Sequence, residues 1–253
     1  MSKNVACICT ISHEHNKLPE TWGNTITDSN YDSAVLVDCT GNSFIKKGFL
    51  YTEHDLRNSL NFHHGVSNRH YWNSFGNRNI IWFYAYLRML HFYISYPNYE
   101  YYWFFDDDVD IDNWNEFLSD TDQHAADFIS YFIFKNKNIN AQPDVPEIND
   151  NTVSKHMWFE RFPGHTDTLP LEIKDLFGSF FPTTRFSNRA LKEILKYNNQ
   201  GYFGWHEGFV PTLLNYSGLT LKTLINSDNT SNLFDNKRNK VYHKHSIINW
   251  EWI

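Results

Sequence analysis

Tyr101-Tyr-Trp-Phe-Phe-Asp-Asp-Asp-Val-Asp110 is the stretch that decides the fold of this chain. It opens with five consecutive aromatic residues, too apolar for a solvated surface and too few for a buried helix, so they predict a buried β-strand. Acidic residues begin abruptly where the aromatic run ends. In an open α/β sheet, ligands bind beyond the carboxyl ends of the strands. The sequence therefore predicts a ligand site at Asp106, Asp107 and Asp108.

Three adjacent carboxylates would repel one another strongly without a counter-charge. Hard divalent cations bind oxygen ligands, and Mg²⁺ is commonly held by one or two carboxylates together with substrate phosphates. We therefore interpret Asp106 and Asp108 as ligands of Mn²⁺ or Mg²⁺ in a metal and diphosphate site. An acidic turn after an ordinary strand is the alternative interpretation.

The composition is that of a packed globular protein, and the length allows one large domain or two small ones. The chain has 253 residues, of which 41% are hydrophobic and 18% aromatic. Its formal net charge of −7 argues against nucleic acid as a partner, because binding to phosphate backbones requires a basic face.

Cysteines and apolar segments bear on the cellular compartment. Cys7, Cys9 and Cys39 are too few for a disulfide framework, so we expect free thiols in a reducing compartment, with Cys7 and Cys9 on one face of a strand. No apolar run approaches the roughly 20 residues of a membrane-spanning helix. We expect a cytoplasmic protein, and its many aromatic side chains leave peripheral contact with a membrane open.

Alternating and helical patterns predict an α/β fold with a mainly parallel central sheet flanked by helices. The expected strands, beside the aromatic one, are Val5–Ile11, Ser33–Asp38, Asp127–Phe134 and Leu219–Ile225. Leu176–Pro182 and Val241–Ile247 are expected to be ordered as well. The expected helices are Pro19–Thr27, Asn79–Tyr96, Trp114–Leu118, Ser187–Tyr197 with Ser187 as its cap, and Glu207–Tyr216. Between them, Lys135–Lys174 is rich in Pro, Asn and Asp and predicts a long excursion that shapes a substrate cleft.

Two other classes of protein place Asp-x-Asp after an apolar segment. An EF-hand loop needs glycine at its sixth position and glutamate at its twelfth. Registers that start at Asp106 or Asp108 put other residues at both positions, namely Ile111 and Phe117 or Asn113 and Ser119. A phosphatase with Asp106 as nucleophile stays open as an alternative, and so does a carbohydrate-binding protein without catalytic activity.

With these motifs in order, the chain resembles the GT-A-fold glycosyltransferases, which use nucleotide sugars as donors. The resemblance implies a single GT-A-like domain with a Rossmann-like nucleotide-sugar-binding half, residues 1–112, and an acceptor-binding and catalytic half, residues 113–253. The segments that resemble the family are the aromatic strand with its Asp-x-Asp motif, Asn77-Arg-Asn79, Leu176-Phe-Gly-Ser-Phe-Phe-Pro182, Gly204-Trp-His-Glu-Gly208 and Val241-Tyr-His243.

This resemblance implies the roles of the metal ligands and of the base. Asp108, and Asp106 directly or through water, would hold the cation against both phosphates of a nucleoside diphosphate sugar. His243 would complete the metal shell, and a nitrogen ligand favours Mn²⁺ over Mg²⁺, although His245 competes for that role. Glu207 would be the general base that removes the proton of an acceptor hydroxyl, which implies an inverting enzyme. A structural acid in the first turn of a helix is the alternative for Glu207.

Nucleotide contacts are expected at the strand ends. Thr10 and Ser12 lie at the end of the first expected strand, and Asp38 ends the second. Together with Arg78, Asp106 and Asp107, they are the predicted residues of the nucleotide-sugar site, and Trp158 and His165 are candidate acceptor contacts. The predicted partners are a nucleoside diphosphate sugar and a hydroxyl of a glycan or related acceptor. Synthesis of a surface polysaccharide is the setting that this reaction would fit.

Overall fold

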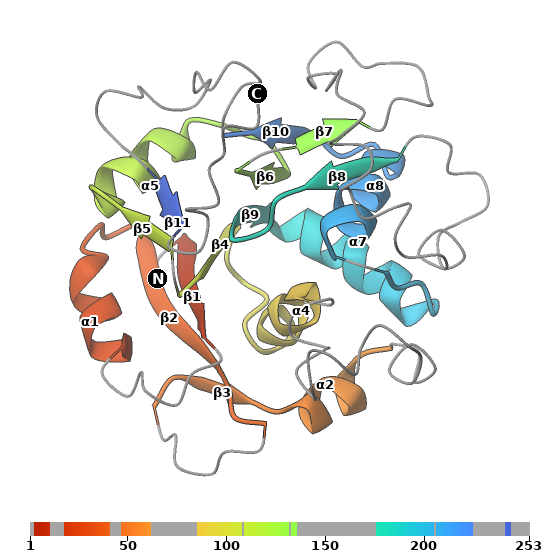
Figure 1. Cartoon of the computed structure of the whole chain (residues 1–253), viewed down its shortest axis with the longest axis horizontal. Coiled ribbons are helices and arrows are strands. Elements are labelled where there is room, and N and C mark those ends of the chain that lie inside the picture. The colour runs from red at the N-terminus through yellow and green to blue at the C-terminus, as the bar shows by residue number, and fades with distance from the viewer. Residues whose placement is uncertain are drawn as a thin grey trace.

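The computed structural model describes nine parts of the chain, residues 3–10, 18–40, 47–61, 85–107, 109–131, 133–135, 176–204, 206–224 and 241–243. For residues 18–20, 134 and 241–243, only the backbone is described. These parts form an α/β structure with a central sheet and helices on both of its faces (Figure 1).

The central sheet has seven strands in the order β10-β6-β9-β4-β1-β2-β3. Neighbouring strands run parallel except β9, which is antiparallel to both β4 and β6. The strands are β1 (Asn4–Thr10), β2 (Tyr31–Asp38), β3 (Phe49–Tyr51), β4 (Tyr101–Asp106), β6 (Phe128–Ser130), β9 (Thr183–Ser187) and β10 (Leu221–Thr223). Two small antiparallel pairs stand beside it, β5 (Val109–Ile111) with β11 (Val241–His243), and β7 (Ile133–Lys135) with β8 (Phe177–Ser179).

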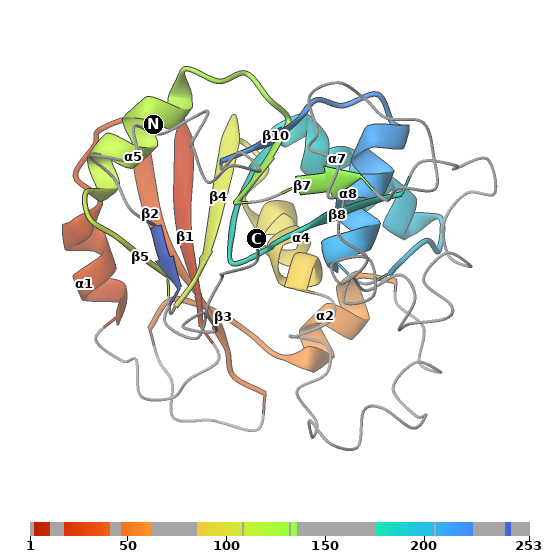
Figure 2. The ribbon, with the colours of Figure 1, turned by 45° about the horizontal axis from the view of Figure 1, so that its top comes forward.

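Helices cover the sheet as two layers (Figures 1 and 2). One face carries α1 (Leu18–Thr25) and α5 (Trp114–Asp122), and the other carries α2 (Glu53–Ser59), α4 (Ala85–Ser95), α7 (Asn188–Asn199) and α8 (His206–Tyr216). Successive strand residues point to opposite faces. Tyr102 and Phe104 accordingly join the core beneath α4, whereas Trp103 and Phe105 join the core beneath α1 and α5.

The aromatic run forms the centre of the sheet, as the sequence predicts. Strand β4 lies between β1 and β9, and its residues Tyr102 to Phe105 are each at most 1% exposed. Trp103 and Phe105 stack at 5.3 Å between ring centroids on one face. Because burial of one large aromatic side chain contributes about 1.5–3 kcal/mol, this strand anchors both cores and fixes where the aspartates after it emerge.

Several predicted elements are confirmed, with boundaries that shift by a few residues. Ser187 caps α7, since its hydroxyl accepts a hydrogen bond from the backbone N–H of Ala190 at 3.2 Å. The three cysteines are free, and Cys7 and Cys9 are both buried on one face of β1. The helix expected from residue 79 is described from Ala85.

Other predictions about the sheet are wrong in part. The single strand expected over Asp127–Phe134 is two strands, since β6 belongs to the central sheet and β7 pairs with β8. The segment Leu176–Pro182 is ordered, as expected, and contains β8, but the antiparallel strand β9 that follows it was not expected. Strand β3 and helix α2 were also not expected, since both are short. The excursion after Lys135 lies outside the described residues.

A buried carboxylate ties the second half of the sheet together. Asp127, which is 1% exposed, precedes β6 and accepts hydrogen bonds from the Ser187 hydroxyl at 2.8 Å and from the N–H and hydroxyl of Thr220 at 2.9 Å each. Arg189 adds an ion pair to both of its oxygens. Burial alone would raise the pKa of Asp127, but these partners outweigh it and lower the pKa to about 2.

Stability is therefore expected to depend on the charge of Asp127. A carboxyl that titrates near 3.9 when unfolded and near 2 when folded contributes about 2 kcal/mol above pH 4. Because the folded pKa is depressed, this contribution is lost as the pH falls from about 4 through about 2. Urea unfolding should show Asp127→Asn less stable than the natural chain by about 2 kcal/mol at pH 7, and the difference should shrink towards pH 2. The exposed Asp112→Asn is the control and should change stability by about 0.5 kcal/mol or less.

No helix within the described ranges is both long enough and apolar enough to cross a membrane.

Candidate functional site

The carboxyl ends of four parallel strands meet at one edge of the central sheet. Pairing registers set Cys9 opposite Asp106 and Asp38 opposite Tyr51, so the last residues of β1, β2, β3 and β4 lie in one row. The predicted site residues Thr10, Asp38 and Asp106 belong to this row. In parallel sheets this edge is where ligands bind, because loops and helix ends leave it open and polar. The row is the framework of the candidate site.

Thr10 and Asp107 contact each other directly across the two central strands. The Thr10 hydroxyl donates a hydrogen bond to Oδ2 of Asp107 at 2.5 Å, and Thr10 is 1% exposed. A hydroxyl on a rigid strand holds the carboxylate in one orientation, and a charge-assisted bond of this kind is stronger than one between neutral groups. The structure thus brings together two residues that the sequence assigns to one site.

Asp106 is bound from behind by a buried arginine. Arg88 lies on α4, is 6% exposed and forms an ion pair with Oδ1 of Asp106, whose side chain is 35% exposed. The backbone N–H of Asp106 also donates to the carbonyl of Pro182 at 2.8 Å. Arg88 is thus buried, whereas Asp106 is partly exposed. The ion pair therefore presents an oriented, ionised carboxylate to a ligand that binds at this edge.

Cys9 and Tyr51 surround Arg88 in the layer below. Burial raises the pKa of the Cys9 thiol to about 12, and the nearby Arg88 only partly opposes this, so Cys9 stays protonated and unreactive. Burial also raises the pKa of Tyr51 well above its usual value. Within the described residues, neither the Tyr51 hydroxyl nor Nε of Arg88 has a hydrogen-bond partner. Buried donors left in this state are typical of functional sites or of positions that bind ordered water.

Asp38 stabilises the turn that directly follows β2. It is 6% exposed, and its Oδ1 accepts a hydrogen bond from the N–H of Thr40 at 2.7 Å. Thr40 in turn accepts one from the N–H of Glu53 at the start of α2, at 2.8 Å. This Asx-type turn closes β2 towards α2. Its role in binding a nucleotide stays a prediction, and the observed contacts give Asp38 a structural task at the correct edge of the sheet.

Glu207 is a buried carboxylate in the first turn of α8. It is 6% exposed, and its backbone carbonyl accepts a hydrogen bond from the Ser179 hydroxyl of β8 at 3.3 Å. The N-terminal end of a helix favours negative charge, so its position satisfies the structural alternative as well as the catalytic one.

One short segment connects the start of α8 with the aspartates. His206 lies edge-on against Phe181, with 4.6 Å between the ring centroids. Pro182, the residue after Phe181, accepts the hydrogen bond from the N–H of Asp106 at its backbone carbonyl. The chain at Phe181 and Pro182 therefore reaches from the end of β4 to the beginning of α8, which puts Glu207 on the same side of the sheet edge as Asp106.

His243 is brought next to the acidic motif by the backbone. Strand β11 pairs antiparallel with β5, and its register sets His243 opposite Val109, the residue that follows Asp108. Residues that are some 135 positions apart in the chain are thus neighbours (Figure 1). The side chain of His243 is outside the described part of the structure, so its role as a metal ligand stays a prediction.

Several predicted site residues lie outside the described residues, namely Ser12, Arg78, Asp108, Trp158 and His165. Among the side chains that are described, no group of three His, Cys, Asp or Glu is placed to hold a metal ion. Asp108 and the side chain of His243, which complete the predicted metal shell, do not belong to that set.

Arg88 and Tyr51 are functional candidates that sequence reasoning missed. Arg88 carried a usable signal, because it is a charged residue within a run of apolar helical positions, Leu87, Met89 and Leu90 among them, directly before the acidic strand. A charge on a buried helix requires a partner, and the aspartates of the next strand are the nearest candidates. Tyr51 carried no comparable signal, because β3 is only three residues long.

Comparison with known proteins adds no family to this description, since no protein-family model and no curated protein matches the chain.

Proposed function

We propose that this chain is a metal-dependent glycosyltransferase that transfers a sugar, with inversion, from a nucleoside diphosphate sugar to a hydroxyl of a glycan or related acceptor. The observation that supports this most is the position of Asp106 and Asp107 at the end of the central strand β4, in one row with the ends of β1, β2 and β3. A mainly parallel sheet with acidic residues at this point agrees with what the resemblance to GT-A-fold enzymes implies, and the finer likeness to that fold is part of the proposal.

The donor atoms at this edge suit a hard divalent cation. Carboxylate oxygens are the preferred ligands of Mg²⁺ and Mn²⁺, and an imidazole nitrogen at His243 favours Mn²⁺. When bound, such a cation stabilises the negative charge that develops on a leaving diphosphate. Since Arg88 engages Asp106 and Thr10 engages Asp107, we assign direct ligation to Asp108 and His243, with Asp106 acting through water.

Glu207 supplies the acid–base step in this proposal. An acceptor hydroxyl is a weak nucleophile at neutral pH, and a carboxylate within hydrogen-bonding reach removes its proton as the new glycosidic bond forms. The proton passes to the Glu207 carboxylate, and the diphosphate departs from the opposite face of the anomeric carbon. The position of Glu207 supports this role, because α8 begins beside Phe181, which directly precedes the residue bonded to Asp106.

We expect nucleoside diphosphates to stabilise the protein only when Mn²⁺ is present. A ligand at about 100 times its dissociation constant adds about 2.7 kcal/mol, which for a chain of this size is a rise in melting temperature of about 5–10 °C. A thermal-shift screen of UDP, GDP, ADP, CDP and dTDP, each with Mn²⁺ and with EDTA, measures this. A rise with one nucleotide that EDTA abolishes supports the proposal, and transfer or hydrolysis of the matching nucleotide sugar follows as the assay.

The alternatives predict different outcomes in the same tests. Release of inorganic phosphate from simple phosphate esters would favour a hydrolase with Asp106 as nucleophile, although the Arg88 ion pair already occupies one of its oxygens. Glycan binding without any nucleotide effect, unchanged in Asp106→Asn and Asp108→Asn, would favour a non-catalytic carbohydrate-binding protein. No response to any nucleotide with Mn²⁺ would contradict the proposed function.

A further inference from the structure

Strand β2 has an open edge over the first half of its length. The strand has eight residues, Tyr31–Asp38, but β3 has three and pairs only with Leu36–Asp38. On this side, the stretch 31–35 has no neighbouring strand among the described residues. An uncovered strand edge presents backbone donors and acceptors that another extended chain can pair with.

Gly48 is the reason why β3 does not continue along that edge. Its φ of +102° turns the chain, and a Cβ atom at this position would lie 2.7 Å from the carbonyl oxygen of Val35. Only glycine tolerates both the positive φ and this close approach. At Gly48 the chain therefore leaves the sheet beside Val35. No described residue occupies the strand position that lies beside residues 31–35, in line with β3, and we call this position the vacant column.

Ser33 directs its backbone groups into this vacant column. In a strand, alternate residues point their N–H and C=O to opposite edges. Cys39 donates its N–H to Tyr51 of β3, and the Val35 carbonyl faces Gly48, so odd-numbered residues of β2 face this edge. The N–H of Tyr31 is already bonded to Asp28. Ser33, exposed and between them, faces the column with both of its backbone groups.

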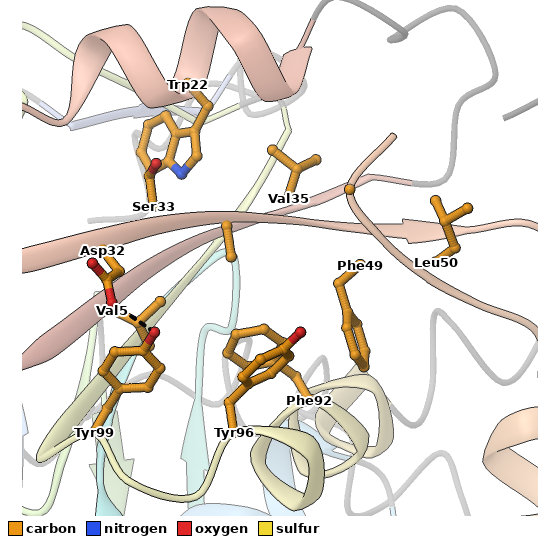
Figure 3. Close-up of a pocket in the computed structure, with 12 residues that line it drawn as sticks. Val5, Trp22, Asp32, Ser33, Val35, Phe49, Leu50, Phe92, Tyr96 and Tyr99 are labelled. Atoms are coloured by element: carbon orange, nitrogen blue, oxygen red, sulfur yellow. Dashed lines mark hydrogen bonds between the residues drawn. The ribbon is translucent and has the colours of Figure 1, made fainter. Parts of the chain in front are cut away.

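A pocket of about 740 Å³ occupies the column and extends around both faces of the strand edge. Figure 3 shows Trp22, Ser33 and Val35 on one side of the strands, and Asp32, Tyr96 and Tyr99 on the other. A sugar or a nucleotide would fill one side of a sheet. A strand added to the edge fills both, because its backbone lies in the plane of the sheet and its side chains alternate above and below it.

The lining of the pocket also indicates the chemistry of the occupant. Aromatic and aliphatic side chains dominate it, and Leu50 and Tyr96 are 40% and 48% exposed. Asp32 is the one charged side chain among the described residues that line the pocket, and it accepts a hydrogen bond from the Tyr99 hydroxyl at 2.8 Å. With a net charge of −7 on the whole chain, charge complementarity favours a segment that carries apolar side chains and a basic one opposite Asp32.

A second copy of this chain fits the gap poorly. Suppose that two copies paired their β2 edges antiparallel, centred on Ser33. Residues 36–38 of each copy, together with the attached β3, would then lie beyond Tyr31 of the other copy. That place is filled by the turn Asp28–Asn30, which is bonded to Lys3, Asn4 and Tyr31. The gap between this turn and Gly48 spans residues 31–35, about 16 Å of extended chain, and suits a short peptide.

We propose that the open edge of β2 is a docking site for an extended segment of a partner protein, about five residues long, which adds to the sheet as an eighth strand beside Ser33. The backbone groups of Ser33 supply the main-chain pairing. Tyr96, which directly follows α4, and its aromatic neighbours receive an apolar side chain, and Asp32 receives a basic one. The site lies at the amino-terminal half of β2, away from the strand ends that carry Asp38 and Asp106.

The test selects seven-residue peptides from a random displayed library on the natural chain and measures the affinity of the selected peptides by fluorescence polarisation. Ser33→Pro removes the N–H that faces the gap and leaves the pairing with β1 intact, since proline is tolerated on a strand edge. Ser33→Thr keeps the N–H and is its control. Tyr96→Ala removes an aromatic wall, and Tyr216→Ala, a tyrosine of similar exposure on α8, is the matched control.

We expect the selected peptides to be extended and to combine basic with apolar residues. They should bind at least tenfold more weakly to Ser33→Pro and Tyr96→Ala than to the two control variants. Hydrogen exchange of the Ser33 amide should slow when the peptide binds, a readout that stands even if the proline variant folds poorly. Failure to select any peptide, or equal binding to all four variants, overturns the proposal. The proposal is also overturned if the natural chain sediments as a dimer and the Ser33→Pro variant sediments as a monomer. None of these measurements needs metal or nucleotide, so the proposal fails or stands apart from the proposed function.

Discussion

Replacement of Asp106 by alanine is expected to lower the free energy of unfolding by about 3 kcal/mol, although a third of this side chain is exposed. The reason is Arg88, which is 6% exposed and pairs with Asp106. Removal of one partner from a buried ion pair leaves the other charge desolvated and uncompensated, which costs about 3–5 kcal/mol. The open side of the pair places the expected value at the lower end. Urea denaturation followed by circular dichroism measures it.

Asp110→Ala is the matched control for this change. It removes an exposed aspartate only four positions further along the chain, so stability should change by about 0.5 kcal/mol or less. The double variant Arg88→Met with Asp106→Ala should recover much of the lost stability, because it removes the stranded charge as well. If Asp106→Ala is no more destabilising than Asp110→Ala, the pair does not have the energetic weight that its burial implies.

This expectation changes how variants of the acidic motif have to be interpreted. A loss of activity in Asp106→Ala would combine a metal effect with a stability effect, whereas Asp106→Asn keeps the shape and one hydrogen-bond acceptor for Arg88. Binding of Mn²⁺, measured by electron paramagnetic resonance well below the melting temperature, separates the two contributions. The structure thus makes Asp106 both a part of the candidate site and a counter-ion of the core.

The elements that could be predicted from sequence are those in which local pattern and tertiary environment agree. Strand β4 is buried on both faces, so its continuous aromatic run is unambiguous. Ser187 is followed by a helix with one apolar face and so is recognisable as a cap. The edge at which Thr10, Asp38 and Asp106 meet follows from strand order alone, because parallel strands end on the same side.

The elements that were missed depend on partners that are distant in sequence. The segment of β9 reads Thr-Thr-Arg-Phe-Ser, which is polar, yet all five residues are buried. Its Arg185 is buried because its guanidinium donates to the carbonyls of Thr121, His124 and Ala126 and stacks on the ring of Tyr101. No local pattern encodes such compensation. The same holds for Arg88, whose partner is 18 residues away.

Replacement of Glu207 by glutamine is expected to lower kcat by about 10²- to 10⁴-fold, the range in which a general base contributes. Glutamine has nearly the same shape but cannot accept the proton of an acceptor hydroxyl. The affinity for the nucleoside diphosphate found in the thermal-shift screen should stay within about threefold, because the base contacts the acceptor and not the diphosphate. The measurement is the transfer rate at saturating donor, together with titration of the nucleotide in the presence of Mn²⁺.

Glu116→Gln separates catalysis from helix capping in this experiment. Glu116 is likewise an acid in the first turn of its helix, α5, where its backbone N–H donates to the Asn113 side chain at 3.2 Å. If Glu207 only complements the helix dipole, both substitutions should cost at most about 1 kcal/mol of stability and leave the transfer rate unchanged. A large loss of kcat in Glu207→Gln alone, with nucleotide affinity preserved, is the pattern that a capping role cannot produce, because a capping residue has no contact with the acceptor proton.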